Sequence, residues 1–492
     1  KPSAVNLVFI SGDMEDIDFL HTYDLRTKDV ATEEYHEAVG MMGFGGKYNF
    51  YFFDLYAVPW HDTQGFPDLD PTDDVGWYDK TWNNDMINLH DIHTDKRHAQ
   101  LISDYANNAT SFIITPSYVY EPIYKSKYVA DIVLVSMGSD ASVPSLTDKF
   151  FNANKIKDEL EKLTPFSEWE VKFTVKKISD RDFPTSLRDA INAQKAVEIV
   201  PGYPEYGTVQ VVSSDKIKKA VIEWATTQNT SGINDYKDIE NSTWTIPVII
   251  IIDDKQNYLY IETNDGVRVQ GIAPSHPNDP TQPCCALGVM TDWEIWNDKH
   301  GATDLALHEI GHTMSFMHPF MAYTDEGEFV TQDYFKKWYW GVMGYNGPGM
   351  GCGSWYDSLV NTEETCGIAD TFFTQFDRDN YSRGVTVNLI KTIHINIYNS
   401  MLELERDGQD LDNLPQETKD TLSKINSFLN KAESRLKAND LNSSDGSIKN
   451  ALEGAILSSK LAEKSNVSYE VQDKSKIKLN IPSWIKNSAK WW

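Results

Sequence analysis

The stretch TIPVIIIID, residues 245–253, limits the choice of folds more than any other part of this sequence. Apolar residues fill consecutive positions, so both faces of a strand formed here are apolar. Such a strand lies in the middle of a sheet covered on both faces, because a half-exposed strand alternates apolar and polar residues. The sequence therefore predicts an α/β (α+β) domain built on a mixed sheet, with further strands at 128–136 and 169–177 and helices at 154–163, 185–196 and 216–227.

The chain is too long for one hydrophobic core, because 492 residues normally divide into about two to four domains. Short aromatic runs indicate a β-rich N-terminal region at residues 1–125. The α/β domain follows at residues 126–392. Apolar residues at three- and four-residue steps then predict helices at residues 393–470, as a small bundle or a solvated stalk. Residues 471–492 form an aromatic tail.

Charge and hydropathy narrow the class of protein. The chain has 45 basic and 73 acidic residues, a formal net charge of −28. A nucleic-acid-binding protein needs a basic face, so we expect no nucleic-acid partner. No run of 18 apolar residues occurs, so we expect no transmembrane segment. An acidic loop offers candidate Ca²⁺ ligands, although it lacks the glycine and glutamate of an EF-hand: Asp68, Asp70, Asp73 and Asp74.

Three features favour a secreted or cell-surface location. The chain begins at Lys1 without a methionine, which we interpret as a mature N-terminus after removal of a signal peptide. An even number of cysteines predicts one or two disulfides tying loops together, or alternatively buried thiols: Cys284, Cys285, Cys352 and Cys366. Six Asn-x-Ser/Thr triplets predict glycosylation, at Asn108, Asn229, Asn241, Asn380, Asn442 and Asn466.

The strongest chemical signal is LALHEIGHTMSFMHPF, residues 305–320. His308 and His312 are four residues apart, about 40° of rotation on a helix, so both imidazoles leave the same face. Neutral imidazole is a good ligand for Zn²⁺. Glu309 follows the first histidine and can act on a water molecule without binding the metal itself. The pattern predicts a zinc site on a helix, with Glu309 as the general base.

His318 is the candidate third ligand, but a continuous helix would turn it about 240° away from His312. The helix must therefore end between them, and Pro319 favours an extended conformation for His318. The break usually needs a positive φ, which glycine adopts freely and Ser315 adopts at a cost of about 1–2 kcal/mol. Alternatively, Ser315 stays in a helical last turn and the chain bends at residues 316–317.

Other acidic residues compete with His318 as the third ligand. A thermolysin-like site takes a glutamate about twenty residues after the second histidine. Glu326 and Glu328 lie only fourteen and sixteen residues after His312, whereas Asp333, at twenty-one, fits an aspartate-zinc site. None of the three comes with a second motif residue, so the sequence favours His318.

The run His308-Glu-x-x-His312-x-x-Ser315-x-x-His318 resembles the zinc signature of the metzincin metallopeptidases, with serine in place of the usual glycine. Metzincins also have a Met-turn, which places a methionine beneath the zinc histidines, and the downstream segment WGVMGY, residues 340–345, matches it. The resemblance implies that Met343 is the Met-turn methionine. It also implies that Tyr345 binds the metal or stabilises the transition state.

The resemblance implies a secreted zinc endopeptidase whose substrate is a peptide or protein. Zn²⁺ would lower the pKa of a water molecule and polarise the scissile carbonyl. Glu309 would take the water proton and deliver it to the leaving amine, and Tyr345 would hydrogen-bond the developing oxyanion. An edge strand within residues 267–273 could hold the peptide by strand addition. The alternative is a surface or S-layer-associated binding protein with a structural or vestigial zinc site.

The last twelve residues, IPSWIKNSAKWW, resemble a tail motif that recurs in secreted proteins of ammonia-oxidising archaea. The resemblance implies an archaeal source and an extracellular location, and it carries no activity. We also expect the C-terminal helical module to provide attachment to the cell surface or self-association.

Overall fold

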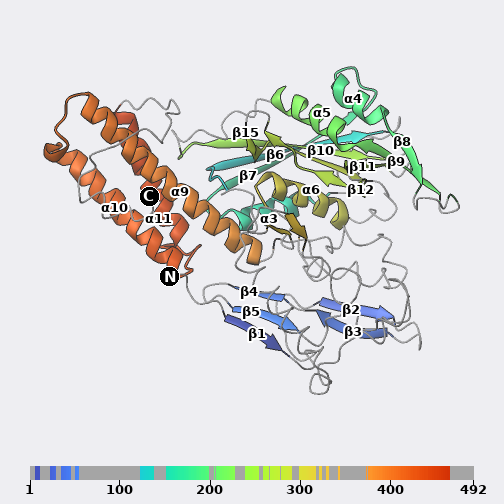
Figure 1. Cartoon of the computed structure of the whole chain (residues 1–492), viewed down its shortest axis with the longest axis horizontal. Coiled ribbons are helices and arrows are strands. Elements are labelled where there is room, and N and C mark those ends of the chain that lie inside the picture. Colours follow the sequence, from blue (N-terminus) through green and yellow to red (C-terminus); the bar gives the residue numbers. More distant parts are fainter. Residues whose placement is uncertain are drawn as a thin grey trace.

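The computed structural model describes most of the region from residue 122 to residue 465 and a few strands outside it. The longer described ranges are 122–137, 151–198, 207–227, 239–253, 259–264, 268–276, 279–290, 299–316 and 375–465. The shorter ones are 6–10, 23–28, 35–40, 42–45, 50–54, 204, 266, 321–323, 329–331, 342–343 and 373. Together they form a mixed α/β fold, as expected (Figure 1).

A five-stranded sheet forms the centre of the fold, in the order β13-β16-β10-β6-β7. Its strands are β6 (Lys127–Ser136), β7 (Glu168–Lys177), β10 (Thr243–Ile252), β13 (Gly271–Ile272) and β16 (Ala286–Met290). The first-named edge strand, β13, is antiparallel to its neighbour, and all other pairs are parallel. The sheet is therefore mixed.

The apolar run at residues 245–253 lies in the central strand β10, as predicted. Ile250 and alternate residues of β10 belong to the core on one face of the sheet, whereas Ile249 and Ile251 belong to the core on the other face. All three side chains are buried. Continuous burial on both faces explains why this strand has no polar alternation.

Helices cover both faces of the sheet (Figure 1). α3 (Ala153–Leu163) and α6 (Lys299–Thr313) contribute their apolar residues to one core. α4 (Thr185–Asn192) and α5 (Ser214–Thr227) contribute theirs to the other. The expected helix at 185–196 is too long, because residues after Ala193 leave the helix and pair with a neighbouring strand as β8 (Lys195–Glu198).

A second sheet of four strands lies beside the first, in the order β12-β11-β9-β8. It adds β9 (Thr208–Ser213), β11 (Leu259–Glu262) and β12 (Arg268–Val269). β11 and β12 form a hairpin, whose turn closes through the amide of Gly266 donating to Thr263 O at 3.0 Å. The chain then passes directly from β12 into β13, so one segment joins both sheets.

The C-terminal region is a bundle of three helices, so the solvated-stalk alternative is wrong. They are α9 (Gln375–Arg406), α10 (Gln416–Lys437) and α11 (Ser447–Lys464), and all three pack on one another. α9 begins before the expected boundary between residues 392 and 393 and runs through it. Its buried residues share a core with the sheet and α6, so this boundary does not separate two cores (Figure 1).

The remaining described elements are one 3₁₀ helix, η8 (Leu411–Asn413), and short strands. In the N-terminal region these are β1 (Asn6–Ile10), β2 (Tyr23–Lys28), β3 (Tyr35–Gly40), β4 (Met42–Gly45) and β5 (Phe50–Asp54). Two hairpin-like pairs follow later, β14 (Ser275–His276) with β15 (Asp279–Pro283) and β17 (Met321–Tyr323) with β18 (Phe329–Thr331). Within the described residues, no helix combines the length and apolar character needed to cross a lipid bilayer.

Candidate metal centre

α6 brings His308 and His312 together as the helical spacing predicts. The two rings stand at 90° to one another with centroids 4.6 Å apart. Their Nε2 atoms face each other at 3.0 Å. His308 is buried and His312 is partly buried at the same end of the helix. The helix therefore presents two imidazole nitrogens at one point.

Backbone carbonyls hold the other nitrogen of each ring. His308 Nδ1 lies 2.5 Å from Val342 O, and His312 Nδ1 lies 2.8 Å from Phe316 O. A carbonyl oxygen accepts hydrogen bonds and cannot donate them, so each Nδ1 must carry the proton. In a neutral ring the Nε2 atom is then an unprotonated acceptor. This is the orientation that outer-shell carbonyls impose on metal-binding histidines.

Two acceptor nitrogens facing each other at 3.0 Å have no proton to share, and a cation between them removes that repulsion. Tetrahedral Zn²⁺ at 2.0–2.1 Å from each ligand nitrogen would separate the two nitrogens by about 3.3 Å. Burial lowers the pKa of His308 to about 3, with the neighbouring His312 as a smaller cause, and burial lowers the pKa of His312 too. The donor set therefore fits a zinc ion.

The helix ends at Ser315, which adopts a left-handed φ of 90°. The amide of Phe316 donates to Gly311 O at 3.0 Å, and the amide of Ser315 donates to His312 O at 2.9 Å. These two bonds form a Schellman motif, in which glycine is the usual residue at the left-handed position. Ser315 therefore makes the break itself, and the alternative with a helical Ser315 and a bend at 316–317 is wrong.

The same turn also orients a candidate ligand, because it brings Phe316 O back to His312 Nδ1. The Phe316 ring is buried against Tyr381 of α9, with ring centroids 6.1 Å apart. Tyr381 Oη in turn lies 3.0 Å from Tyr128 Oη on β6. The first turns of the C-terminal bundle thus support the carbonyl that holds His312, a role that no sequence pattern indicated.

Glu309 lies against the edge strand β13. A Cβ atom on Gly271 would overlap the Glu309 carboxylate, so only glycine leaves room for that side chain. Glu309 is buried, burial raises the pKa of its carboxyl, and its Oε2 has no hydrogen-bond partner among the described residues. An isolated glycine inside a strand often marks such a close approach, and Gly271 is the signal that the sequence reading did not use.

Met343 lies beneath the histidine helix. A Cβ on Gly311, the residue before His312, would collide with the Met343 sulfur. The turn that carries Met343 also supplies Val342 O to His308. Both Val342 and Met343 are buried. One turn therefore supports the helix from below and orients a candidate ligand.

Several candidate residues lie outside the described residues. Among these are the third ligand His318 and the tyrosine Tyr345, together with Glu326, Glu328, Asp333, Cys352, Cys366, Asp68, Asp70, Asp73 and Asp74. The described residues alone contain no group of three His, Cys, Asp or Glu side chains that could hold a metal ion. The pair of histidines is thus the part of the site that the structure shows.

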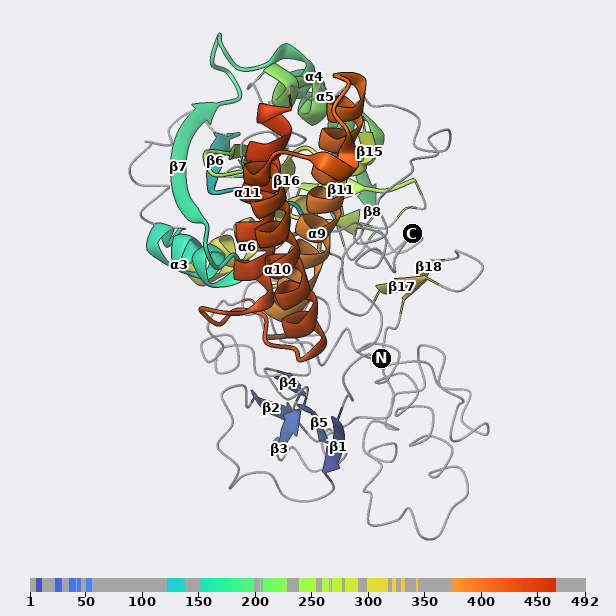
Figure 2. The same cartoon turned by 90° about the vertical axis from the view of Figure 1, so that its left-hand side faces the viewer.

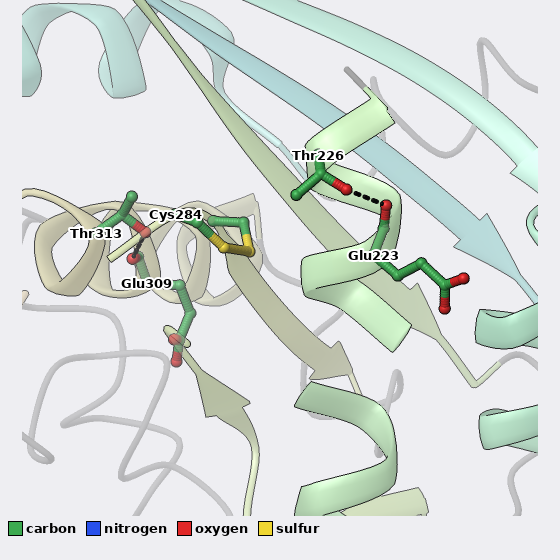
Figure 3. The surroundings of a disulfide bond; sticks show 6 residues. Glu223, Thr226, Cys284, Glu309 and Thr313 are labelled. Carbon is green, nitrogen blue, oxygen red and sulfur yellow. Dashed lines mark hydrogen bonds between the residues drawn. A yellow bond between two sulfur atoms is a disulfide. The ribbon is translucent and has the colours of Figure 1, made fainter. Parts of the chain in front are cut away.

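Cys284 and Cys285 form a disulfide with each other, immediately before β16. Because its two residues are adjacent, it does not tie separate loops together, contrary to the expectation for this pair. Both cysteines are buried. Figure 3 shows the disulfide in view between α6, with Glu309 and Thr313, and α5, with Glu223 and Thr226.

Two further buried polar residues were not anticipated correctly. Asp304, one turn before His308 on α6, is completely buried, and neither carboxylate oxygen has a hydrogen-bond partner among the described residues. Burial raises the pKa of its carboxyl to about 8.

Asn380, expected as a glycosylation site, is 5% exposed within α9, so its triplet cannot accept a glycan in this fold. Asn241 and Asn442 are exposed.

Comparison with protein-family models and curated proteins identifies no relative of this chain. No protein-family model matches the chain, and no curated protein matches it significantly.

Proposed function

We propose that the protein is a secreted zinc-dependent endopeptidase of metzincin type. The observation that carries the proposal is the facing pair of unprotonated Nε2 atoms on His308 and His312, each ring held by a backbone carbonyl. A pair of histidines that is only packed and binds no metal needs no such mutual orientation. Glu309, the residue between them in sequence, has its carboxylate beside the edge strand of the sheet.

Each residue has a defined role in the proposal. His308 and His312 hold Zn²⁺, with His318 as the third ligand that the resemblance implies. The ion supplies Lewis acidity for the carbonyl and lowers the pKa of water. Glu309 takes a proton from the attacking water and passes it to the leaving amine. Tyr345 hydrogen-bonds the developing oxyanion, a role that the resemblance alone implies.

The position of β13 supports a peptide as the substrate. β13 is the edge strand of the five-stranded sheet and lies directly under the Glu309 carboxylate. A peptide that adds to this edge as a further strand would bring its backbone past the general base. Gly271 would keep the carboxylate close to that backbone, because any side chain at this position would displace Glu309.

Other features agree with the metzincin proposal and extend it. A mixed sheet precedes the histidine helix, the helix ends in a left-handed residue at Ser315, and Met343 underlies it. A secreted archaeal origin, Ca²⁺ binding at the acidic loop 68–74 and glycosylation at Asn241 and Asn442 are further parts of the proposal.

The test is a Glu309→Gln variant of the full chain. We expect it to bind one zinc ion as the parent does and to lose peptidase activity by about 10²–10⁴-fold, the usual contribution of a general base. Zinc is measured by elemental analysis, and activity on casein and a peptide library. Glu161→Gln, on the exposed side of α3, is the matched control.

Two outcomes would contradict the proposal. Equal cleavage by Glu309→Gln and the parent would remove Glu309 from the mechanism. Bound zinc in the parent without cleavage of any peptide would instead support the alternative, a surface-associated binding protein with a structural zinc site.

A further inference from the structure

Among the described residues, no further strand lies beside β7, the opposite edge of the five-stranded sheet. β7 pairs with β6 through ten consecutive residues without a register shift, and it ends the strand order. Edge strands are usually shorter, about five or six residues, or are interrupted by a bulge or proline. Figure 2 shows β7 as the long curved strand at the outer side of the sheet.

Hydrogen bonding along β7 identifies the free backbone groups. The amide of Glu168 donates to Ser126 O at 2.9 Å, and the amide of Ile178 donates to Ser136 O at 3.0 Å. Backbone groups alternate in direction along a strand, so even-numbered residues face β6 and odd-numbered ones face outward. The outward groups that form no described hydrogen bond belong to four apolar residues: Trp169, Val171, Phe173 and Val175.

The charges of β7 are arranged so that the strand complements itself. Its first half carries Glu168, Glu170 and Lys172, and its second half carries Lys176 and Lys177 without an acidic residue. Two copies aligned in parallel would place like charges together. Two antiparallel copies place the acidic half of each beside the basic half of the other, and a two-fold axis produces that alignment.

An exposed and strained aromatic residue stands at the start of this edge. Phe166 is 39% exposed and is the only large apolar side chain exposed among the described residues. Its φ is 73°, in a turn closed by the amide of Ser167 donating to Thr164 O. A bulky residue in this conformation is an outlier, and such strain persists where a site needs it.

We propose that the protein forms a two-fold symmetric homodimer in which β7 of one copy pairs antiparallel with β7 of the other. The two five-stranded sheets then become one continuous sheet of ten strands. With the axis at Phe173, the outward backbone groups of Val171 pair with those of the partner copy's Val175. In the same register, Glu170 of each copy lies opposite Lys176 of the other.

Existing ion pairs leave these charges available. Glu170 contacts Lys127 at 2.8 Å and Lys172 at 3.3 Å, and Lys176 contacts Asp182 at 2.7 Å. Glu170, Lys127 and Lys172 are each about two-fifths or more exposed, so these contacts are weak and can be exchanged. Phe166 would lie at each end of the joined strands, beside the turn after the partner's β7.

The first test measures the mass of the full chain by sedimentation velocity between 1 and 100 µM, about the range in which such dimers form. We expect a dimer in the parent. Val171→Pro should abolish it, because proline removes an outward amide and leaves the bonds to β6 intact. Val171→Ala, which keeps the amide, is the matched control and should stay dimeric.

Charge reversal provides a second and independent test. Lys176→Glu should weaken the dimer at least tenfold, and Glu170→Lys combined with Lys176→Glu should restore it. Lys424→Glu, the same charge change on the exposed side of α10, should leave it unchanged. A monomeric parent at 100 µM, or a dimer that is unaffected by both Val171→Pro and Lys176→Glu, would overturn the proposal.

Discussion

Two helical regions bury polar side chains in opposite ways. On α6, the buried groups include His308, Glu309 and Asp304, and in the described structure the acidic oxygens Glu309 Oε2 and both oxygens of Asp304 have no hydrogen-bond partner. In the bundle beyond the first two turns of α9, buried polar groups are paired among the described residues. From residue 382 to residue 465, no described buried side-chain nitrogen or oxygen lacks a partner.

The bundle satisfies its polar groups between helices. Thr386 Oγ1 lies 3.0 Å from Ser447 Oγ, which joins α9 to α11. Further along the same interface, Asn396 donates its amide group to Ser458 Oγ and Ser459 Oγ, both at 3.2 Å. These bonds fix how α9 and α11 pack, and a polar contact of this type needs nothing from outside the chain.

This difference in hydrogen bonding distinguishes buried polar groups that only pack from those that could bind a ligand. A buried polar group costs about 1–3 kcal/mol if its hydrogen bond is missing, so unpaired groups gathered on one helix indicate that a ligand completes them. On α6 the acceptors without a described partner lie near two histidines, whereas the bundle from residue 382 onward has the same kinds of atoms with partners. Burial alone would have marked both regions equally.

The largest expected effect is a loss of zinc affinity from a substitution on α6 that a substitution in the bundle does not cause. His312→Ala removes one of two facing donors, and we expect zinc to bind more than about a hundredfold more weakly, which exceeds the loss caused by outer-shell changes. Asn396→Ala should leave zinc affinity unchanged and lower the free energy of unfolding by about 1–3 kcal/mol. Competition with a chelating dye measures the first, and urea unfolding the second.

Opposite results would remove the distinction. If Asn396→Ala weakened zinc binding as strongly as His312→Ala, the bundle would be part of the site and not only a support for it.

The next effect concerns Gly271 and Glu309. Gly271→Val should lower kcat/KM by about a hundredfold, because a side chain on β13 displaces the carboxylate and a small misplacement of a reacting group has effects of this size. Zinc content and the melting temperature should change little. Gly266→Ala, at an open turn position with a φ of 83° and no contact to Glu309, is the control, and its backbone strain should lower the melting temperature and leave kcat/KM nearly unchanged.

Asp304 on α6 makes the stability of the protein depend on pH. Burial raises the pKa of its carboxyl to about 8, from an ordinary value of 3.8, so the folded state holds a proton that the unfolded state releases between these values. The folded state therefore binds more protons in this window, and the stability contribution of Asp304 falls as pH rises from about 4 to 8.

Asp304→Asn should remove this fall, because an amide does not ionise, and should raise the free energy of unfolding at pH 8 by more than about 1.4 kcal/mol, the equivalent of one pKa unit. Urea unfolding at pH 5, 6.5 and 8 measures it, with Asp407→Asn, an exposed residue after α9, as the control. Equal pH slopes for the parent and Asp304→Asn would show that Asp304 is ionised in the folded state throughout.

The smallest effect lies at the end of α6. Ser315→Gly should stabilise the protein by about 1 kcal/mol, because glycine adopts a φ of 90° without the strain of a side chain. Ser315→Val should destabilise it by more than that, since β-branched residues are least tolerant of this conformation. Thermal unfolding measures both, and an unchanged melting temperature for Ser315→Val would contradict the strain.

Local patterns in the sequence were enough to predict the central strand and the paired histidines. The apolar run at 245–253 has no other place than mid-sheet, and the four-residue step of His308 and His312 needs only a helix. The need for a break after His312 was also visible, although two turn geometries remained open.

Contacts between distant segments could not be predicted in this way. Gly271 meets Glu309 only after β13 has joined the sheet beside β16, and Tyr381 reaches Phe316 from more than sixty residues away. The boundary expected at 392 failed to mark a separate core for a similar reason. A helix pattern shows that α9 exists, but it does not show that its first turns pack on the end of α6.

Ser315 also bears on how related chains are recognised. A motif search that requires the letter glycine three residues after the second histidine passes over this sequence. The fold requires a backbone angle at that position, and serine provides it with the two hydrogen bonds of the helix end intact. A search pattern can specify the backbone conformation at this position and allow every residue type that adopts it. Such a pattern would find chains that a pattern requiring glycine misses.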